Sequence, residues 1–239
     1  MALTKVQIFI PCFIDQLFPQ TAVNMVKILR VAGCEVDYNS NQTCCGQPAF
    51  NSGFWDEAKT VAEKWVNDMT KLPFPIVSPS SSCVGFVRNY MCDMELNSNE
   101  YLNTKDQTFE FSEFLVNTLN KTDFGAVLNA KAVYHDSCAA LRECKIHEAP
   151  RKLLANVKGL ELFDLPDADQ CCGFGGTFSV KFEPISAAMA EKKVQNALSV
   201  GAEYIISADL SCLMQLDGYI KKHKLPIKVM HIADLLVLK

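Results

Sequence analysis

Short apolar runs alternate with longer amphipathic stretches along the whole chain. The runs are typical of buried parallel strands, and the stretches that follow carry apolar residues at helical spacing. The expected strands are 6–10, 34–38 and 75–78, then 132–135, 160–165, 204–207 and 228–230. The expected helices are 20–31, 55–69 and 109–119, then 150–156, 184–199 and 231–238. This alternation predicts an α/β protein built from parallel βαβ units.

The second part of this pattern repeats the first. Three cysteine landmarks recur in the same order, and the pairs are Cys12 and Cys138, Cys44 and Cys171, and Cys83 and Cys212. Subtracting their residue numbers gives offsets of 126, 127 and 129. Self-similarity at one period indicates a repeated structural unit. We therefore expect two tandem Rossmann-like half-domains, residues 1–125 and 126–239, joined near residues 121–130.

Composition and charge exclude several classes of protein. Hydrophobic residues make up 49% and charged residues 21%, as in ordinary globular proteins. The net charge of −4 argues against a nucleic-acid partner. No run reaches the roughly 20 apolar residues that a membrane-spanning helix needs, and residues 1–11 lack the features of a signal peptide. We expect a cytoplasmic protein without direct membrane insertion.

Cysteine usage departs from this ordinary picture, because the chain has 11 cysteines. In a reducing compartment such thiols indicate metal binding or catalysis rather than disulfides. Each half carries a cysteine, then a Cys-Cys-Gly motif, then another cysteine. These eight candidate ligands are Cys12, Cys44, Cys45 and Cys83, followed by Cys138, Cys171, Cys172 and Cys212. We expect structural roles for the three others, Cys34, Cys92 and Cys144.

The spacing of the eight cysteines indicates how they meet. Thirty-one residues separate Cys12 from Cys44, and 32 separate Cys138 from Cys171, which is too far for a local loop site. Cysteines that each follow a strand can meet at the carboxyl edge of a parallel sheet. Four thiolates suit an iron-sulfur cluster or tetrahedral zinc. Three interpretations stay open: an electron-transfer subunit, a zinc-stabilised scaffold, and a thiol-disulfide enzyme that uses the vicinal pairs.

Two neighbouring features refine this prediction. His135 lies three residues before Cys138 and could approach the second group of cysteines, but we favour a hydrogen-bonded histidine at the end of a strand. The loop 173–176 is rich in glycine, but Phe178 stands where a dinucleotide-binding fingerprint requires its last glycine. We therefore predict no flavin or nicotinamide site from this loop.

Several longer stretches, at residues 44–53, 134–138, 171–180, 208–213 and 229–233, resemble a known family. The paired Cys-Cys-Gly repeats are similar to the cysteine-rich domains found in heterodisulfide reductase and in the iron-sulfur subunit of glycolate oxidase. Over essentially the whole chain, the sequence more closely resembles the lactate utilization protein A family. That resemblance implies an iron-sulfur subunit, inactive alone, of a cytoplasmic system that oxidises L-lactate to pyruvate with two partner proteins.

The sequence departs from the broader pattern of these cysteine-rich domains, which ends in Cys-x-x-Cys. Ser80 and Asp209 occupy the first of those two positions. Each half thus keeps four cysteines, and the resemblance implies one [4Fe-4S] cluster per half, with zinc in one or both sites as the alternative. An oxygen ligand from Ser80 or Asp209 is a further possibility.

Overall fold

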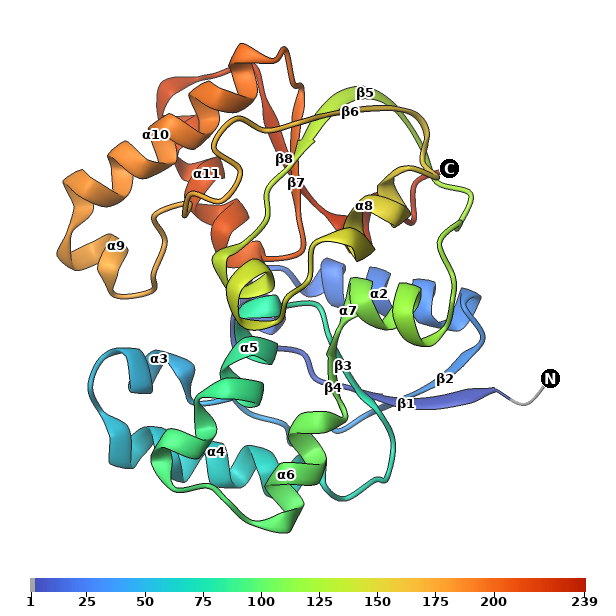
Figure 1. The fold of residues 1–239 in the computed structure, drawn as a ribbon, viewed down its shortest axis with the longest axis vertical. Helices are drawn as coiled ribbons and strands as arrows, with labels where there is room; N and C mark the ends of the chain where they lie inside the picture. The colour runs from blue at the N-terminus through green and yellow to red at the C-terminus, as the bar shows by residue number, and fades with distance from the viewer. Residues whose placement is uncertain (1–2) are drawn as a thin grey trace.

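The structure is a computed structural model that describes residues 3–239, and it contains two parallel four-stranded sheets. The first has the order β2-β1-β3-β4, formed by β1 (Thr4–Ile8), β2 (Cys34–Tyr38), β3 (Ile76–Ser78) and β4 (Thr108–Glu110). The second has the order β6-β5-β7-β8, formed by β5 (Val127–Tyr134), β6 (Lys158–Phe163), β7 (Tyr204–Ser207) and β8 (Lys228–His231). The shared strand order confirms the predicted α/β repeat (Figure 1).

Helices connect the strands in both halves. The first half has α1 (Cys12–Leu17), α2 (Pro19–Val31), α3 (Gln47–Asn51), α4 (Trp55–Met69), α5 (Ser81–Asn89), the 3-10 helix η1 (Met91–Met94), α6 (Asn99–Asp106), α7 (Phe111–Glu113) and the π-helix η2 (Phe114–Thr118). The second has the π-helix η3 (Ala139–Glu143), α8 (Glu148–Leu154), α9 (Phe178–Lys181), α10 (Glu183–Ser199), α11 (Leu210–His223) and α12 (Ile232–Leu235). Within residues 3–239, no helix combines the length and apolarity needed to cross a bilayer.

The two sheets share one central layer of helices. Helices α2, α7 and α8 lie between the sheets, α4 and α6 cover the outer face of the first, and α10 covers the outer face of the second (Figure 1). Helix α12 packs into the same central core as α2 and α8. Neighbouring residues of β3 illustrate the alternation of strand side chains. Val77 packs into the central core and Ile76 into the outer core of the first half. The halves therefore bury a common core, and the boundary between residues 125 and 126 stays a prediction.

Three expected elements differ from the structure. The expected helix 109–119 is wrong at its start, because Thr108–Glu110 pair with β3 as the edge strand β4. The expected linker 121–130 is too long, since β5 begins at Val127. The expected terminal helix 231–238 is too long at both ends, since His231 ends β8 and caps the helix, which runs only from Ile232 to Leu235. Most other expected strands and helices lie within about two residues of their expected bounds.

A buried glutamate ends β4. One carboxylate oxygen of Glu110, Oε2, accepts hydrogen bonds from the backbone N–H groups of Ser112 at 2.8 Å and Glu113 at 3.2 Å, which caps α7. The other oxygen has no hydrogen-bond partner within the described chain. Burial raises the pKa of Glu110 from 4.5 to about 8. The folded protein therefore holds a proton on Glu110 at pH values where the unfolded chain has released it.

This proton makes stability depend on pH. Between pH 5 and pH 8 the folded state binds more protons at Glu110 than the unfolded state, so the free energy of unfolding falls as pH rises. Glu110→Gln does not titrate, and we expect it to avoid a loss on the order of 4 kcal/mol at pH 8. Urea denaturation of both proteins at pH 5 and pH 8 measures the difference. Parallel pH profiles for the two proteins would contradict the raised pKa.

Candidate metal centres

The strand order creates one switch point in each sheet, where the connections leave to opposite sides. In the first half this point lies between β1 and β3, and in the second between β5 and β7. Cys12 and Cys83 follow β1 and β3, while Cys138 and Cys212 follow β5 and β7. Ligands of open parallel sheets bind at such points, outside the carboxyl ends of the strands. The chain thus brings the first and last cysteine of each motif to one place.

Two of these cysteines lie in the first turn of a helix. Cys83 is the third residue of α5, and Cys212 is the third residue of α11. The free N–H groups in the first turn of a helix carry partial positive charge, which stabilises a thiolate. The vicinal pairs lie in loops that follow the neighbouring strands and precede α3 and α9.

The four predicted cysteines of the first half form a chain of pairwise contacts. The thiol of Cys44 is hydrogen-bonded to those of Cys12 and Cys45, and Cys45 is also hydrogen-bonded to Cys83. Cys45 is buried, whereas Cys12 is exposed to solvent. The first group of thiols therefore has a closed side and an open side.

The second half repeats this arrangement. Cys171 is hydrogen-bonded to Cys138 and Cys172, and Cys172 is also hydrogen-bonded to Cys212. Cys172 and Cys212 are both buried. The structure thus brings together the eight cysteines named from the sequence, in two groups of four. That these thiols hold a metal stays a prediction.

A glycine closes each Cys-Cys-Gly turn, and its backbone requires that residue. Gly46 and Gly173 have φ angles of 99° and 91°, which strain any L side chain. Their N–H groups donate to the Sγ atoms of Cys44 and Cys171, both at 3.4 Å. Hydrogen bonds to sulfur stabilise thiolates and tune iron-sulfur centres.

Crowding the thiols changes their pKa values. The hydrogen bond to Cys44 and burial raise the pKa of Cys12. For Cys44, the bond from Cys12 lowers the pKa, but the bond to Cys45 and burial outweigh it and raise the pKa to about 11. The hydrogen bonds from Cys138 and Cys172 lower the pKa of Cys171 instead. Each group consequently retains protons at neutral pH that a bound metal has to displace.

Metal uptake should therefore release protons. We expect the affinity for Zn²⁺ to rise with pH, by about tenfold per pH unit for each proton released. The sign follows from the raised pKa values, since protonated thiols compete with the ion at low pH. Calorimetric titration in buffers of different ionisation enthalpy counts the protons. Zinc binding with no proton release between pH 6 and pH 8 would show that the thiols are already ionised.

The carboxyl edges of the two sheets face each other. The hydroxyl oxygens of Ser81 and Ser137, one from each half, lie 2.8 Å apart. His231 Nδ1 accepts from Ala233 N–H at 3.1 Å, so its Nε2 donates across the junction to the Pro79 carbonyl at 3.2 Å. These contacts place both thiol groups beside a single junction between the halves.

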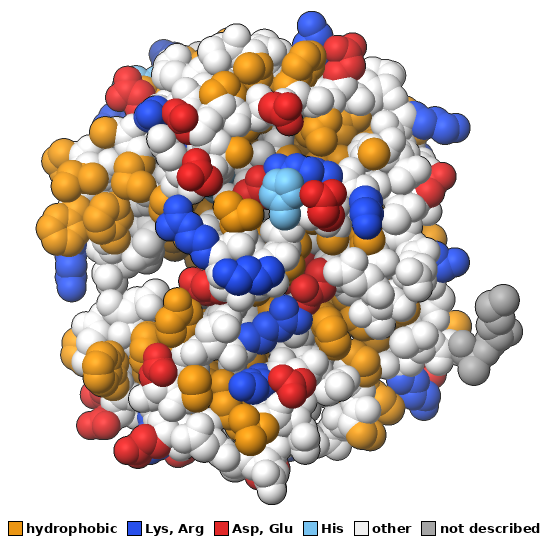
Figure 2. Space-filling view, in the orientation of Figure 1, with side chains coloured by type: hydrophobic (Ala, Val, Ile, Leu, Met, Phe, Trp, Pro, Cys, Tyr) orange, Lys and Arg blue, Asp and Glu red, His pale blue; other side chains and the backbone are white. Residues whose placement is uncertain are grey.

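The junction opens into a notch on the side of α3 and α9 (Figure 2). The rings of Phe13 and Phe174, which follow Cys12 and Gly173 in the chain, pack across the halves with centroids 6.0 Å apart. Large exposed apolar side chains lie on α4 and its N-terminal neighbour, and on α9 and α10: Phe54, Trp55, Val180, Phe182 and Ile185. The surface near both Cys-Cys loops is therefore unusually apolar.

Comparison with known proteins agrees with this geometry. The sequence matches the family model described as a cysteine-rich domain (CCG) over residues 6–88 and 132–217. Lactate utilization protein A of Geobacillus sp. (strain WCH70) is 44% identical over 236 residues, which covers 97% of this chain and 98% of the relative. The chain belongs to the lactate utilization protein A family. Lactate utilization protein A 1 of Bacillus mycoides (strain KBAB4) is also 44% identical, over 97% of this chain and 96% of its own.

A solved structure supports the fold of this family member. The crystal structure of a hypothetical protein from Helicobacter pylori superposes with a TM-score of 0.61 at 10% identity. The superposition covers 98% of this chain, which spans about half of that protein, 48% of its length. At this identity the likeness concerns the fold alone.

Asp209, one of the two positions where this family member departs from Cys-x-x-Cys, is fully hydrogen-bonded. Its Oδ2 accepts from the Ser82 N–H at 3.0 Å and the Ser81 hydroxyl at 3.2 Å. Its Oδ1 accepts from the N–H and hydroxyl of Ser211, at 3.3 Å and 2.5 Å. The carboxylate thus caps α11 and bonds to the start of α5 in the other half, which explains its burial without a metal. Ser80 pairs with the Ser82 hydroxyl at 3.0 Å.

The surroundings of His135 differ from those expected from the sequence. Its side chain is 0% exposed, and neither ring nitrogen has a hydrogen-bond partner among the described residues. Burial lowers the pKa of His135 to about 4, so its imidazole is neutral. A ring nitrogen and the Sγ atoms of Cys172 and Cys212 all lie within 4.8 Å of one another. His135 does follow the end of β5, but the expected hydrogen bonds of its side chain are absent among the described residues, so that part of the interpretation is wrong. The alternative, that His135 approaches the second group of cysteines, agrees with the structure.

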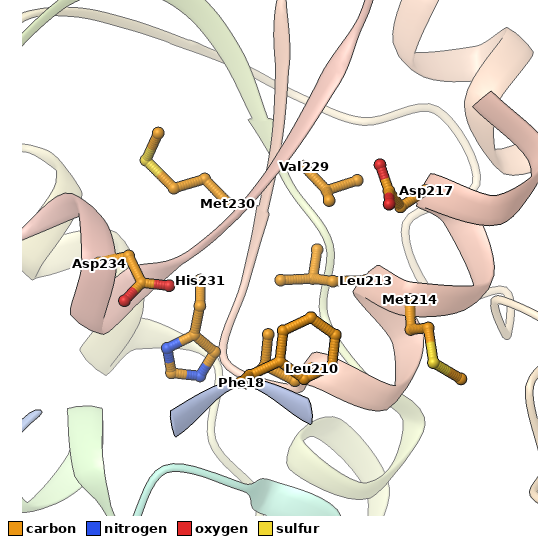
Figure 3. A pocket seen from close by; sticks show the side chains of 9 residues that line it. All are labelled: Phe18, Leu210, Leu213, Met214, Asp217, Val229, Met230, His231 and Asp234. Atoms are coloured by element: carbon orange, nitrogen blue, oxygen red, sulfur yellow. The ribbon is translucent and has the colours of Figure 1, made fainter. Parts of the chain in front are cut away.

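A separate pocket of about 170 Å³ lies between α11 and β8, and its described lining residues include none of the eight candidate cysteines (Figure 3). Its lining is mostly apolar, with His231 and the carboxylates of Asp217 and Asp234 at its edge. Its described lining residues include neither lysine nor arginine. Such a pocket does not suit an anionic carboxylate such as lactate.

Proposed function

We propose that this chain is an iron-sulfur subunit of a cytoplasmic system that oxidises L-lactate, with one [4Fe-4S] cluster in each half. The observation that carries the proposal is the contact of four thiols at the carboxyl edge of each sheet. The lactate component rests on relatives that are named for lactate utilization. The eight proposed ligands are Cys12, Cys44, Cys45, Cys83, Cys138, Cys171, Cys172 and Cys212.

The donors at both edges fit such a group. Four thiolates are the ligand set of a [4Fe-4S] cluster, which supplies one-electron transfer when bound. Gly46 and Gly173 present backbone N–H groups to sulfur, with no side chain in the way. Burial of Cys45, Cys172 and Cys212 excludes water from the inner side of each site.

The arrangement of the halves suits a relay with partner proteins. Oxidation of lactate to pyruvate releases two electrons, and two centres accept one each. Both proposed centres lie beside the same junction, where Ser81 meets Ser137. The exposed Cys12 gives the first centre an open side. We propose that two partner subunits bind lactate and exchange electrons with this chain.

A zinc-stabilised scaffold in the same complex is the second candidate, and the second half favours it specifically. A ring nitrogen of His135 and the Sγ atoms of Cys172 and Cys212 lie within 4.8 Å of one another, a group of donors that could hold a zinc ion. A scaffold of this kind would hold stoichiometric zinc and would have no redox-active absorbance. Metal analysis of protein purified without oxygen therefore separates the two candidates.

Complementation of a deletion strain tests the lactate function. We expect the wild-type chain and Cys92→Ser to restore growth on L-lactate, since Cys92 lies outside both thiol groups. The double variant Cys45→Ser/Cys172→Ser should fail, although it is produced at a normal level. Growth of the deletion strain on L-lactate at the wild-type rate would overturn the proposed function.

A further inference from the structure

The two thiol groups differ in what lies behind them. The glycine of each Cys-Cys-Gly turn packs against a carbonyl of the outer helix: Gly46 against Ala58 of α4, and Gly173 against Ser186 of α10. Ala58 and Ser186 are therefore equivalent, and residues of α4 and α10 correspond at an offset of 128. At this offset Trp65 corresponds to Lys193, whereas the strand-end offset of 126 relates Phe9 to His135. Four fully buried positions can therefore be compared pairwise.

In the first half this pair is apolar. The rings of Phe9 and Trp65 contact edge to face, with centroids 5.3 Å apart and an interplanar angle of 78°. Both belong to the same buried cluster as Cys45. Behind its four thiols, the first group therefore has two aromatic rings. The indole N–H of Trp65 also has no partner among the described residues, but it is a hydrogen-bond donor with no lone pair to offer a metal.

In the second half the equivalent positions are polar. Lys193 is already bonded, since its Nζ donates to the carbonyls of Asp167 at 2.7 Å and Ala168 at 3.3 Å. Only the backbone of His135 is bonded: its N–H donates to the Ile206 carbonyl at 2.8 Å, and its carbonyl accepts from the Ser207 hydroxyl at 2.9 Å. These bonds hold the backbone of His135, and its buried imidazole lies beside Cys172 and Cys212.

Burying an imidazole with both nitrogens unbonded costs free energy, because each nitrogen loses its hydrogen bond to water and gains none in return. Buried polar groups in native proteins almost always have a partner, which includes a metal. The thiols nearest to His135, Cys172 and Cys212, are hydrogen-bonded to each other rather than to the ring. The nitrogen is therefore free to act as a donor to an ion that the thiols hold.

We propose that His135 binds the metal of the second centre through a ring nitrogen, so that this centre has one nitrogen donor beside its thiolates while the first has thiolates alone. The inference rests on the proposed metal binding by the four cysteines of the second half. It makes the two centres chemically unequal. Nitrogen ligation raises the potential of iron-sulfur centres, so the second centre should be reduced before the first.

Pulsed electron paramagnetic resonance on anaerobically purified, reduced protein tests this ligand directly. The chain has four histidines, so labelling them with ¹⁵N gives a small set of candidates. In Cys45→Ser, which retains the second centre, we expect the strong hyperfine coupling of a metal-bound nitrogen that changes with the isotope. It should be absent in Cys172→Ser, which retains the first centre. This comparison leaves His135 itself unchanged.

Two substitutions then assign the nitrogen. His135→Phe, which copies Phe9, should abolish the coupling in the Cys45→Ser background and lower the midpoint potential of the second centre. His147→Phe is the control, at an exposed histidine whose Nδ1 lies 2.9 Å from Glu148. A second centre with no strong nitrogen coupling, or with a coupling that survives His135→Phe, would overturn the proposal.

Binding of cobalt(II) tests the same ligand without iron. Added to metal-free Cys45→Ser, Co²⁺ should show absorption bands of a mixed sulfur and nitrogen site. His135→Phe should shift these bands and weaken binding by about tenfold or more. If no iron assembles but the cobalt bands shift in His135→Phe, the iron-sulfur function is rejected and His135 remains a metal ligand. If iron-sulfur centres assemble without nitrogen coupling and the cobalt bands do not shift, the iron-sulfur function stands and His135 is rejected as a ligand.

Discussion

Replacing Cys172 with serine should remove the second centre and leave the first in place. Cys172 is buried and is hydrogen-bonded to both Cys171 and Cys212, so it occupies the middle of its group. A serine hydroxyl is a poor ligand for iron in a sulfur-rich site. Iron should therefore fall from about eight to about four atoms per chain, with a matching loss of acid-labile sulfide.

The reciprocal variant provides the internal control. Cys45→Ser changes the equivalent position and should remove the first centre, again leaving about four irons per chain. Cys92→Ser should keep all of them, because the described partners of the Cys92 thiol are the Asn89 carbonyl and Asp93, which lie outside both thiol groups. Iron that stays at the wild-type level in Cys172→Ser would contradict its role as a ligand. Complete loss of iron would show that the two centres do not assemble independently.

Gly173→Ala should damage the second centre nearly as severely. A β-carbon at Gly173 would lie 2.6 Å from the Ser186 carbonyl oxygen and 3.0 Å from Met189 Cβ. The φ angle of +91° adds backbone strain for any L side chain. We expect a loss of roughly 3 kcal/mol or more in the free energy of unfolding. The turn should also shift, so that the Cys171 thiol loses the hydrogen bond from Gly173 N–H.

A control at Gly33 separates the effect of backbone strain from the effect of the close contacts around Gly173. Gly33 has a similar φ angle of +95°, but a β-carbon there would meet nothing within 4 Å. Gly33→Ala should therefore cost only the backbone strain, about 1–2 kcal/mol, and should leave metal content unchanged. Denaturation and metal analysis of both variants measure the difference. Equal losses in stability, with metal retained in Gly173→Ala, would show that the close approach has no role.

The regular parts of the fold could be predicted because local signals agree with tertiary packing there. Helix α4 and strands β2 and β7 lie at the residues expected from periodicity. Strand β4 was missed because Thr108–Glu110 is a short edge strand that leads directly into α7. Its position depends on pairing with β3, which lies about 30 residues earlier in the chain, so the local pattern of residues does not indicate it.

The candidate site could be predicted as far as the cysteines, since their repetition reports a shared sheet edge. The unbonded imidazole of His135 could not be predicted, because it depends on which described residues surround the ring in the folded chain, and none of them bonds to either nitrogen. The clue was still present in the sequence. Aligning the halves places His135 opposite Phe9, and a polar residue in place of an aromatic one at a repeated core position indicates a difference between the sites.

Iron, zinc and acid-labile sulfide, measured per chain on protein purified without oxygen and reconstituted with iron and sulfide, test the central claim most directly. Two four-cysteine centres predict about eight irons and eight sulfides per chain, with little zinc and a brown colour that reduction bleaches. A colourless protein that binds no iron under these conditions would contradict the account.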